Sequence, residues 1–261
     1  MTNNKTSKLE IKQRWQSICD QIAIAEKMAS ISMPKASVSS TDSENNLINP
    51  TSNQRIVATI AVSKRQAVDS IQQAYQAGAR LFGESFIQEA IPKIQQLQQL
   101  KDIEWHFIGP IQSNKTRQIA ENFDWVHSLS RDKIARRLSE QRPTSSASIN
   151  VLIQVNISLE STKSGVSVEQ MLPLAKIISE LPQLSLRGIM CIPEKSSEVK
   201  IQADNFHRMH KLFKTVKHFF RDNPAVNIDT LSMGMSGDYQ EAILAGSNMV
   251  RIGTAIFGSR D

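Results

Sequence analysis

The chain has 261 residues, a length that suits one α/β barrel domain, and 40% of them are hydrophobic, which is enough for a large core. The net charge is +6, but the basic residues are spread along the chain and only 5% of residues are aromatic, which argues against dedicated nucleic-acid binding. Two cysteines, Cys19 and Cys191, cannot form a disulfide framework, and no apolar run is long enough for a signal or membrane segment. We therefore expect a cytoplasmic protein that does not bind membranes.

The N-terminal part of the chain predicts a helix followed by a loop. From Leu9 to Ser30, apolar residues recur at steps of three and four, which is typical of a helix that lies against a larger structure. The next stretch, Pro34 to Gln54, is rich in Ser, Asn, Thr and Pro and has no periodicity. We interpret it as a flexible polar loop and assign it no chemistry.

Residues 56–64 read IVATIAVSK, an apolar run interrupted by Thr59 and Ser63 and ended by Lys64. Such runs are typical of strands that are buried on both faces of a parallel sheet. A partly desolvated lysine at the end of such a strand can attack a carbonyl group and form a Schiff base. The alternative is an ordinary solvated lysine that merely ends the strand.

The rest of the chain alternates between predicted strands and amphipathic helices. Seven further strands are expected at 79–83, 104–108, 124–129, 149–157, 184–192, 228–233 and 249–253. This order implies parallel strands with right-handed crossovers. Eight units predict a single (β/α)8 TIM barrel domain over residues 1–261, with an additional N-terminal helix at 9–30. A doubly wound open sheet is the alternative, although no GxGxxG motif follows the first strand.

In a barrel, functional groups gather at the carboxyl ends of the strands. The polar residues predicted there are Lys64, Glu84, Ser85, His106, His127, Asn156, Lys163, Cys191, Ser232 to Ser236, and Arg251 to Thr254. No histidine pair lies with a carboxylate at the spacing of metal ligands, so we expect no metal site. Each histidine alone is more typical of a hydrogen-bonded strand-end residue than of a catalyst.

The ends of the last two strands predict a phosphate site. Ser236 is placed to cap the helix after the seventh strand, and the first N–H groups of such a helix suit a phosphate. After the eighth strand, Gly253 allows close approach to the backbone and Thr254 adds N–H and hydroxyl donors. Loops at these two positions commonly bind phosphate in such barrels. The alternative is glycine turns that only close the barrel.

Closure of the barrel would make the eighth strand a neighbour of the first, so Lys64 would face the predicted phosphate site. A ligand with an aldehyde and a phosphate fits this arrangement, and pyridoxal 5'-phosphate (PLP) is the candidate. Its aldehyde would bind Lys64 and its phosphate would bind Ser236, Gly253 and Thr254. Arg251 points the same way and could meet the ring nitrogen, where its charge would disfavour protonation and weaken the ring as an electron sink.

A set of motifs extends over nearly everything from residue 56 onward. They are AVSK (61–64), FGESFIQEA (82–90), WHFIGPIQSNK (105–115), VLIQVNIS (151–158), KSG (163–165), LRGIMCIP (186–193), LSMGMSGDYQEAI (231–243) and GSNMVRIGTAIFG (246–258). Together they closely resemble the pyridoxal phosphate homeostasis protein family (YggS/PROSC). Two departures are Ser85, where the family usually has Asn, and the long polar insert at 34–54.

This resemblance implies a barrel like the N-terminal domain of alanine racemase, with PLP bound as an aldimine to Lys64. It also implies phosphate contacts at Ser236, Gly253 and Thr254, with Arg251 near the pyridine nitrogen.

Two functions are compatible with these features. An amino-acid racemase of the alanine racemase type needs a second acid/base opposite the lysine. By resemblance, that base comes from an additional β domain across a dimer, and this chain ends at Asp261, soon after the eighth strand. We therefore expect a monomeric PLP carrier without significant turnover, acting in intracellular PLP homeostasis with PLP-dependent apoenzymes as partners. The racemase is the alternative.

Overall fold

Eight parallel strands form a closed barrel in the computed structural model, which describes residues 3–32, 56–158, 164–193 and 199–258. Each strand pairs with the next along the chain, and the last pairs with the first. The strands are β1 (Ala58–Val62), β2 (Leu81–Glu84), β3 (Glu104–Phe107), β4 (Trp125–Leu129), β5 (Ile149–Gln154), β6 (Leu184–Met190), β7 (Thr230–Met235) and β8 (Met249–Ile252). The predicted TIM barrel is confirmed, and the alternative of an open sheet is wrong.

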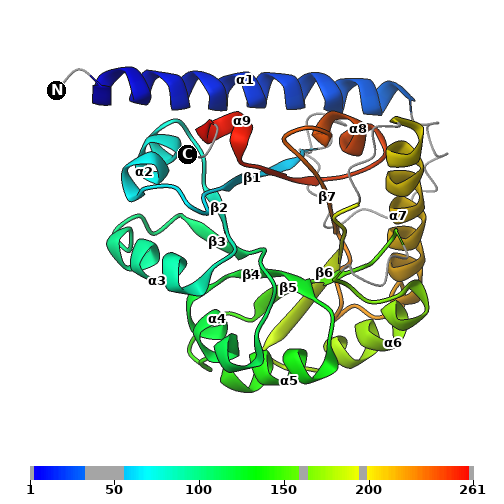
Figure 1. Cartoon of the computed structure of the whole chain (residues 1–261). Coiled ribbons are helices and arrows are strands. Elements are labelled where there is room, and N and C mark those ends of the chain that lie inside the picture. The colour runs from blue at the N-terminus through cyan, green and yellow to red at the C-terminus, as the bar shows by residue number, and fades with distance from the viewer. Residues whose placement is uncertain (1–2, 33–55, 159–163, 194–198, 259–261) are drawn as a thin grey trace.

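Helices surround this barrel, and at least one follows each strand (Figure 1). They are α2 (Val68–Gln76), α3 (Ile87–Gln96), a 3₁₀ helix (Ser113–Lys115) that leads into α4 (Thr116–Asn122), α5 (Asp132–Gln141), α6 (Val168–Ser179), α7 (Val199–Phe219), α8 (Tyr239–Leu244) and α9 (Thr254–Phe257). This alternation buries both faces of the sheet, as a parallel barrel requires.

β1 shows how the apolar runs of the sequence fill two layers. Ile60 and Val62 belong to a cluster inside the barrel, whereas Ala61 belongs to the larger cluster between the strands and the helices. Successive side chains of a strand point to opposite faces, so an uninterrupted apolar run supplies both layers at once. The strand is shorter than the predicted run, and Lys64 lies in a turn two residues beyond its end.

The N-terminal helix α1 (Asn3–Ser32) lies across α2, α8 and α9 along one side of the barrel (Figure 1). Its buried residues form the expected stripe and are Ile11, Trp15, Ile18, Ile22, Ala25, Glu26 and Ala29. The predicted loop at 34–54 and Lys163 lie outside the described residues. Over the ranges that are described, no helix is both long and apolar enough to cross a membrane.

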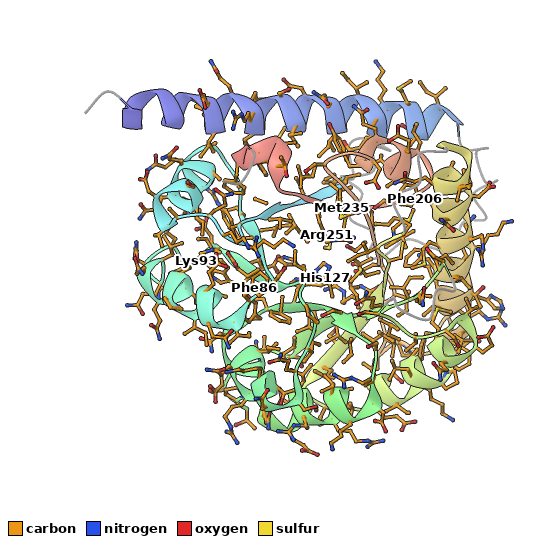
Figure 2. The ribbon with its side chains drawn as sticks, in the orientation of Figure 1. Phe86, Lys93, His127, Phe206, Met235 and Arg251 are labelled. Atoms are coloured by element: carbon orange, nitrogen blue, oxygen red, sulfur yellow. The ribbon has the colours of Figure 1, made fainter. Side chains whose placement is uncertain are left out.

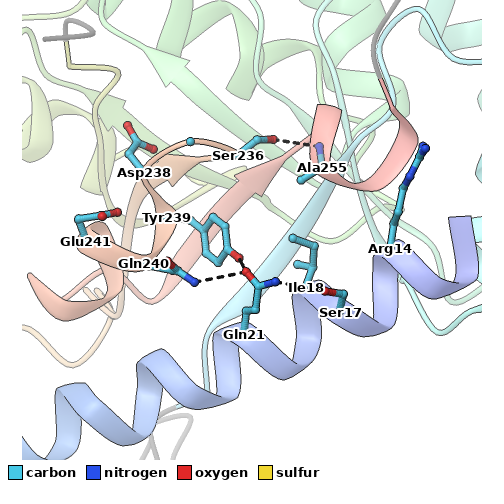
Figure 3. Close-up of a pocket in the computed structure, with 11 residues that line it drawn as sticks. Arg14, Ser17, Ile18, Gln21, Ser236, Asp238, Tyr239, Gln240, Glu241 and Ala255 are labelled. Carbon is cyan, nitrogen blue, oxygen red and sulfur yellow. Dashed lines mark hydrogen bonds between the residues drawn. The ribbon is translucent and has the colours of Figure 1, made fainter. Parts of the chain in front are cut away.

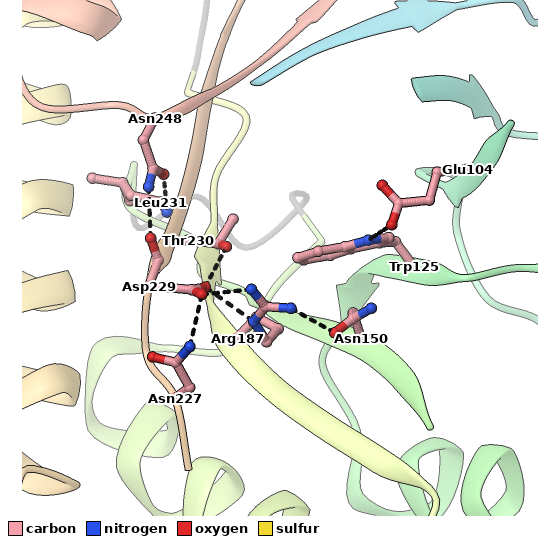
Figure 4. Close-up of polar contacts among 9 residues, drawn as sticks. All are labelled: Glu104, Trp125, Asn150, Arg187, Asn227, Asp229, Thr230, Leu231 and Asn248. Atoms are coloured by element: carbon pink, nitrogen blue, oxygen red, sulfur yellow. Dashed lines mark hydrogen bonds and ion pairs between the residues drawn. The ribbon is translucent and has the colours of Figure 1, made fainter. Parts of the chain in front are cut away.

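A polar network occupies the amino-terminal end of the barrel (Figure 4). Arg187 of β6 donates to both carboxylate oxygens of Asp229, over 3.0 Å and 2.5 Å, and to the Asn150 side chain over 2.8 Å. Its guanidinium also lies 5.1 Å from the centre of the Trp125 ring. Because these polar groups hydrogen-bond to one another, their role at this end of the barrel is structural. A ligand is expected at the opposite end, where the strands end at their carboxyl termini.

Candidate functional site

A cavity of about 530 Å³ lies at the carboxyl end of the barrel. Lys64, Ser236, Arg251, Gly253 and Thr254, the five residues that the sequence predicts for a cofactor, all line it. The remaining lining residues are Val62, Ile108, Ile192, Gln202, Met235, Gly237 and Asp238. Strand pairing explains the convergence, because β1 and β8 are neighbours and therefore end side by side. The volume is in the range typical of small-molecule sites.

Lys64 is half-buried and sits in a turn whose backbone is held from both sides. The carbonyl of Ser63 accepts a hydrogen bond from Lys93 Nζ over 2.8 Å, and the N–H of Arg65 donates to Glu89 Oε1. Arg65 has a φ of 60°, in the left-handed region that side chains other than glycine rarely adopt. Such a conformation costs roughly 1 to 3 kcal/mol and persists only where surrounding contacts enforce it.

Those contacts come from an ion-pair cluster, Glu84, Glu89 and Lys93, which we term the anchor cluster. Lys93 is 5% exposed, and its Nζ lies 2.9 Å from Glu84 Oε1 and 2.5 Å from Glu89 Oε1. Glu84 is fully buried and accepts the Ser63 hydroxyl over 2.7 Å. Burial raises the pKa of the Glu84 carboxyl, and the nearby Lys93 ammonium only partly opposes this shift.

The sequence places Glu84 in the polar ring at the strand ends, but the structure buries it outside the cavity lining. Lys93 is missed by sequence reasoning because it lies in a glutamine-rich helix, where a lysine is usually solvated. A signal was available: Lys93 continues the buried positions Ile87 and Ala90 at a spacing of three residues. It also lies four residues after Glu89, within reach for an ion pair.

Ser236 connects the loops that follow β7 and β8. Its hydroxyl oxygen accepts the N–H groups of Gly253 over 3.2 Å and of Ala255 over 3.4 Å. The prediction that Ser236 caps the next helix is wrong, because α8 begins later and Asp238 occupies the N-cap position. Asp238 Oδ1 accepts the N–H of Met235 over 2.6 Å. The hydroxyl of Ser236 and the amides of the β8 loop are therefore gathered at one point.

A second cavity, of about 340 Å³, lies between α1 and this loop and shares Ser236, Gly237 and Asp238 with the first (Figure 3). The hydroxyl of Tyr239 donates to Gln21 Oε1 over 2.5 Å, which links α8 to α1. The loop that carries Ser236 is thus supported by the N-terminal helix.

Arg251 is 4% exposed and reaches from β8 across the barrel interior (Figure 2). Its Nη1 donates to the Ser232 hydroxyl over 2.6 Å, and its Nη2 donates to the carbonyl of Cys191 over 2.9 Å. Burial lowers the pKa of the guanidinium from its usual value, but an arginine remains charged in proteins. The thiol of Cys191 is buried, which raises its pKa to about 12 and makes it a poor nucleophile.

Behind Arg251, a line of hydrogen bonds runs into the barrel, and we term Ser232, His127 and His106 the histidine chain. Ser232 Oγ lies 3.3 Å from His127 Nδ1, and His127 Nε2 lies 2.9 Å from His106 Nδ1. His106 Nε2 ends the line 3.7 Å from Glu104 Oε1. Burial lowers the pKa of both imidazoles, that of His127 well below 6.5, so both are neutral at physiological pH.

Arg251 orients the start of this chain. It donates to the oxygen of Ser232, which leaves the hydroxyl proton of Ser232 available for His127 Nδ1. The proton of neutral His127 then resides on Nε2 and is donated to His106. The sequence places both histidines in the ring at the strand ends, but they are fully buried inside the barrel and do not line the cavity.

Other predicted strand-end residues also lie outside the cavity lining, namely Ser85, Asn156 and Cys191. Gln202 of α7 lines the cavity and donates to Asp238 Oδ2, a contact that the sequence did not predict. Within the ranges that the structure describes, no three His, Cys, Asp or Glu side chains are grouped as metal ligands.

Comparisons with known proteins agree with this architecture. The family model of the alanine racemase N-terminal domain matches residues 46–261. A Haemophilus influenzae pyridoxal phosphate homeostasis protein is 53% identical over 210 residues, which is 80% of this chain and 87% of the relative. The Escherichia coli K12 protein of the same name is 48% identical over 207 residues, covering 78% and 86%.

Solved structures give the same result. PipY of Synechococcus elongatus with PLP bound is 31% identical to this chain. The two structures superpose with a TM-score of 0.70, over 90% of this chain and all of PipY. Alanine racemase of Corynebacterium glutamicum, at 16% identity and a TM-score of 0.62 over 94% of this chain and 62% of the racemase, shares the fold. This chain therefore belongs to the pyridoxal phosphate homeostasis protein family and has the barrel of the alanine racemase N-terminal domain.

Proposed function

We propose that this protein binds PLP in the cavity at the carboxyl end of the barrel and holds it on Lys64 as a Schiff base. The convergence of Lys64, Arg251, Ser236, Gly253 and Thr254 on one cavity carries this proposal. The PLP-bound structure of PipY supports it. PLP supplies an aldehyde, whose carbon forms a C=N bond to the lysine nitrogen. The aldehyde oxygen leaves as water with two hydrogens from the amine.

The cavity offers donors for the rest of the cofactor. The hydroxyl groups of Ser236 and Thr254 line the cavity and are suited to a phosphate, as is the Gly253 amide, which donates to Ser236 Oγ over 3.2 Å in this structure. Arg251 is suited to the pyridine nitrogen, because its permanent charge keeps that nitrogen unprotonated. An unprotonated ring is a weaker electron sink, which favours holding the cofactor over amino-acid chemistry.

The same residues support a carrier more than a racemase. Racemisation needs acid/base groups on both faces of the substrate. Besides Lys64, Asp238 is the one described lining residue whose side chain could act as an acid or base. Both of its carboxylate oxygens already accept hydrogen bonds, from the Met235 N–H and from the Gln202 side chain. The protein therefore acts in intracellular PLP homeostasis as a carrier without significant turnover. We also propose, as the sequence predicts, that it is monomeric and that PLP-dependent apoenzymes receive the cofactor.

Borohydride reduction tests the Schiff base directly. The protein is mixed with PLP, its visible spectrum is recorded before and after reduction, and the modified peptide is identified by mass spectrometry. We expect the label on Lys64, no bound colour in a folded Lys64→Ala variant, and unchanged labelling in the exposed Lys214→Ala control. Label on another lysine, or colour that persists in Lys64→Ala, would refute the assignment.

A separate measurement tests the absence of turnover. The PLP-loaded protein is incubated with L-amino acids, and D-isomers are sought by chiral chromatography. We expect none above background. Turnover of about 1 per second or faster would identify an enzyme and overturn the carrier.

A further inference from the structure

We propose that the anchor cluster is a positioning device: Glu84, Glu89 and Lys93 hold the strained turn at Lys64 and Arg65 so that Lys64 is presented to the cavity. This inference rests on the proposed function of Lys64. It assigns a role to three residues that lie outside the cavity lining and therefore act through the turn, not through contact with a ligand.

The contacts of Lys93 are the first step of the argument. Its ammonium carries three hydrogens and has three acceptors: Glu84 Oε1, Glu89 Oε1 and the carbonyl of Ser63. All donors of this buried lysine are therefore engaged, so Lys93 is a structural neighbour of Lys64 and not a competing nucleophile. Through the Ser63 carbonyl, Lys93 fixes the backbone immediately before Lys64.

The second step concerns the backbone immediately after Lys64. Arg65 is the one non-glycine residue with a positive φ in the part of the chain that the structure describes. Its N–H is held by Glu89, which is itself held by Lys93. Without these contacts, the turn would relax toward a negative φ, and the direction of Lys64 would change with it.

The third step separates two contributions to the position of Lys64: the backbone strain at Arg65 and the contacts of the anchor cluster. Glycine adopts a positive φ without a steric cost, so Arg65→Gly should preserve the turn even where the cluster is weakened. A merely structural ion pair would lower stability when broken, but glycine at position 65 would not restore ligand binding. The rescue therefore distinguishes positioning from general stability.

The test measures PLP affinity and the rate of Schiff-base formation by stopped-flow absorbance. Lys93→Met and Glu89→Ala should each bind PLP roughly tenfold more weakly than wild type, because the turn is no longer enforced. Glu89→Ala keeps the buried pair of Lys93 with Glu84, so it decides the outcome if Lys93→Met does not fold. Glu89→Gln retains an acceptor for the Arg65 N–H and should bind PLP nearly as wild type does.

Adding Arg65→Gly to Glu89→Ala should recover most of the lost affinity. A readout that needs no cofactor is hydrogen exchange of the Arg65 amide, which should accelerate in Glu89→Ala. The matched control is Arg187→Met, which breaks the ion pair with Asp229 at the opposite end of the barrel. It should lower the melting temperature and leave PLP affinity within about twofold of wild type.

Wild-type affinity in Glu89→Ala, or failure of Arg65→Gly to restore binding, would overturn the positioning role. A loss of affinity in Arg187→Met as large as that in Glu89→Ala would also overturn it, because general destabilisation would then explain both. Failure of the proposed function is distinguishable, since borohydride would then label a residue other than Lys64 in the wild-type protein.

Discussion

Two polar networks flank the cavity, and they are built from opposite kinds of chemistry. The anchor cluster beside Lys64 consists of charged groups, and its bonds end on the backbone, at the Ser63 carbonyl and the Arg65 N–H. The histidine chain behind Arg251 consists of neutral groups and is built from bonds between side chains. The first network thus fixes the course of the main chain, and the second fixes one guanidinium.

The difference corresponds to what each side of the cavity must hold in place. A flexible lysine is aimed mainly by the backbone that carries it, so its supports act on that backbone. An arginine presents a planar fork, so supports on its nitrogens are enough to orient it. The neutral imidazoles behind Arg251 add no charge of their own, so the charge that this side of the cavity offers to a ligand comes from Arg251 and from Asp238, which lines the same cavity.

The largest effect is expected from breaking the charged network with Lys93→Met. Removing one partner of a buried ion pair leaves Glu84 unpaired and should cost about 3 to 5 kcal/mol of folding free energy at neutral pH. Urea unfolding measures this cost. A cost below about 1 kcal/mol would show that the pair is not a buried ionic contact.

The pH dependence of that variant sharpens the test. The pKa of Glu84 is already raised by burial, and loss of the Lys93 ammonium should raise it further. A raised carboxyl pKa favours the folded state at low pH, and this advantage is lost as the pH rises through and above the ordinary value of 4.5. The destabilisation should therefore be greater at about pH 8 than at about pH 5. It should be nearly constant with pH in the control Lys93→Met/Glu84→Gln.

The next effect is expected at the junction of the second network with the cavity. Arg251→Gln removes donors from the Ser232 hydroxyl and the Cys191 carbonyl and should cost about 2 kcal/mol, at roughly 1 per hydrogen bond. It should change the visible spectrum of bound PLP more than its occupancy, because the permanent charge is lost while Lys64 remains. Titration followed by absorbance measures both, and an unchanged spectrum would argue against contact between Arg251 and the ring.

A smaller effect, visible only in acid, is expected from the histidine chain. The depressed pKa values of His106 and His127 mean that the unfolded state binds protons that the folded state excludes. The contribution of these histidines to the free energy of unfolding is therefore fully present above the ordinary histidine pKa of 6.5 and is lost as the pH falls below it. Each histidine contributes a slope of up to about 1.4 kcal/mol per pH unit.

The variant His127→Gln, which can still donate and accept, should reduce that slope. Urea unfolding at several pH values between about 5 and 7.5 measures it. The exposed His207→Gln variant is the control and should leave the slope unchanged. Equal slopes in His127→Gln and wild type would contradict the assignment of a neutral, buried His127.

The sequence predicted those parts of the site that depend on local pattern. Strand ends place Lys64 and Arg251, and the glycine-rich turns place Gly253, because position along a barrel strand determines which residues reach the mouth. The inward position of His106 and His127 depends on which face each alternate residue takes, and a short apolar strand does not reveal that face. Their burial was therefore not predicted.

The residues that hold the site in place could not be predicted from the sequence either. The role of Lys93 depends on how α3 packs beside β1 and β2, a tertiary contact between residues far apart in the chain. Ser236 is assigned to the wrong contact because the N-cap of α8 is Asp238, the residue directly before the helix, and the hydroxyl of Ser236 turns instead to the loop after β8. Its partners, the amides after β8, become visible only once the barrel is closed.

The smallest effect provides a reference outside both networks. Tyr239→Phe removes one hydrogen bond between α8 and Gln21 of α1, and a single bond of this kind contributes about 1 kcal/mol. Because the loop that carries Ser236 precedes α8, PLP affinity should fall by no more than about threefold, and the pH dependence of stability should not change. Unfolding and PLP titration measure both. A loss as large as that in Glu89→Ala would show that α1 controls the cavity as strongly as the anchor cluster does, and the division of labour between the two networks would then be incomplete.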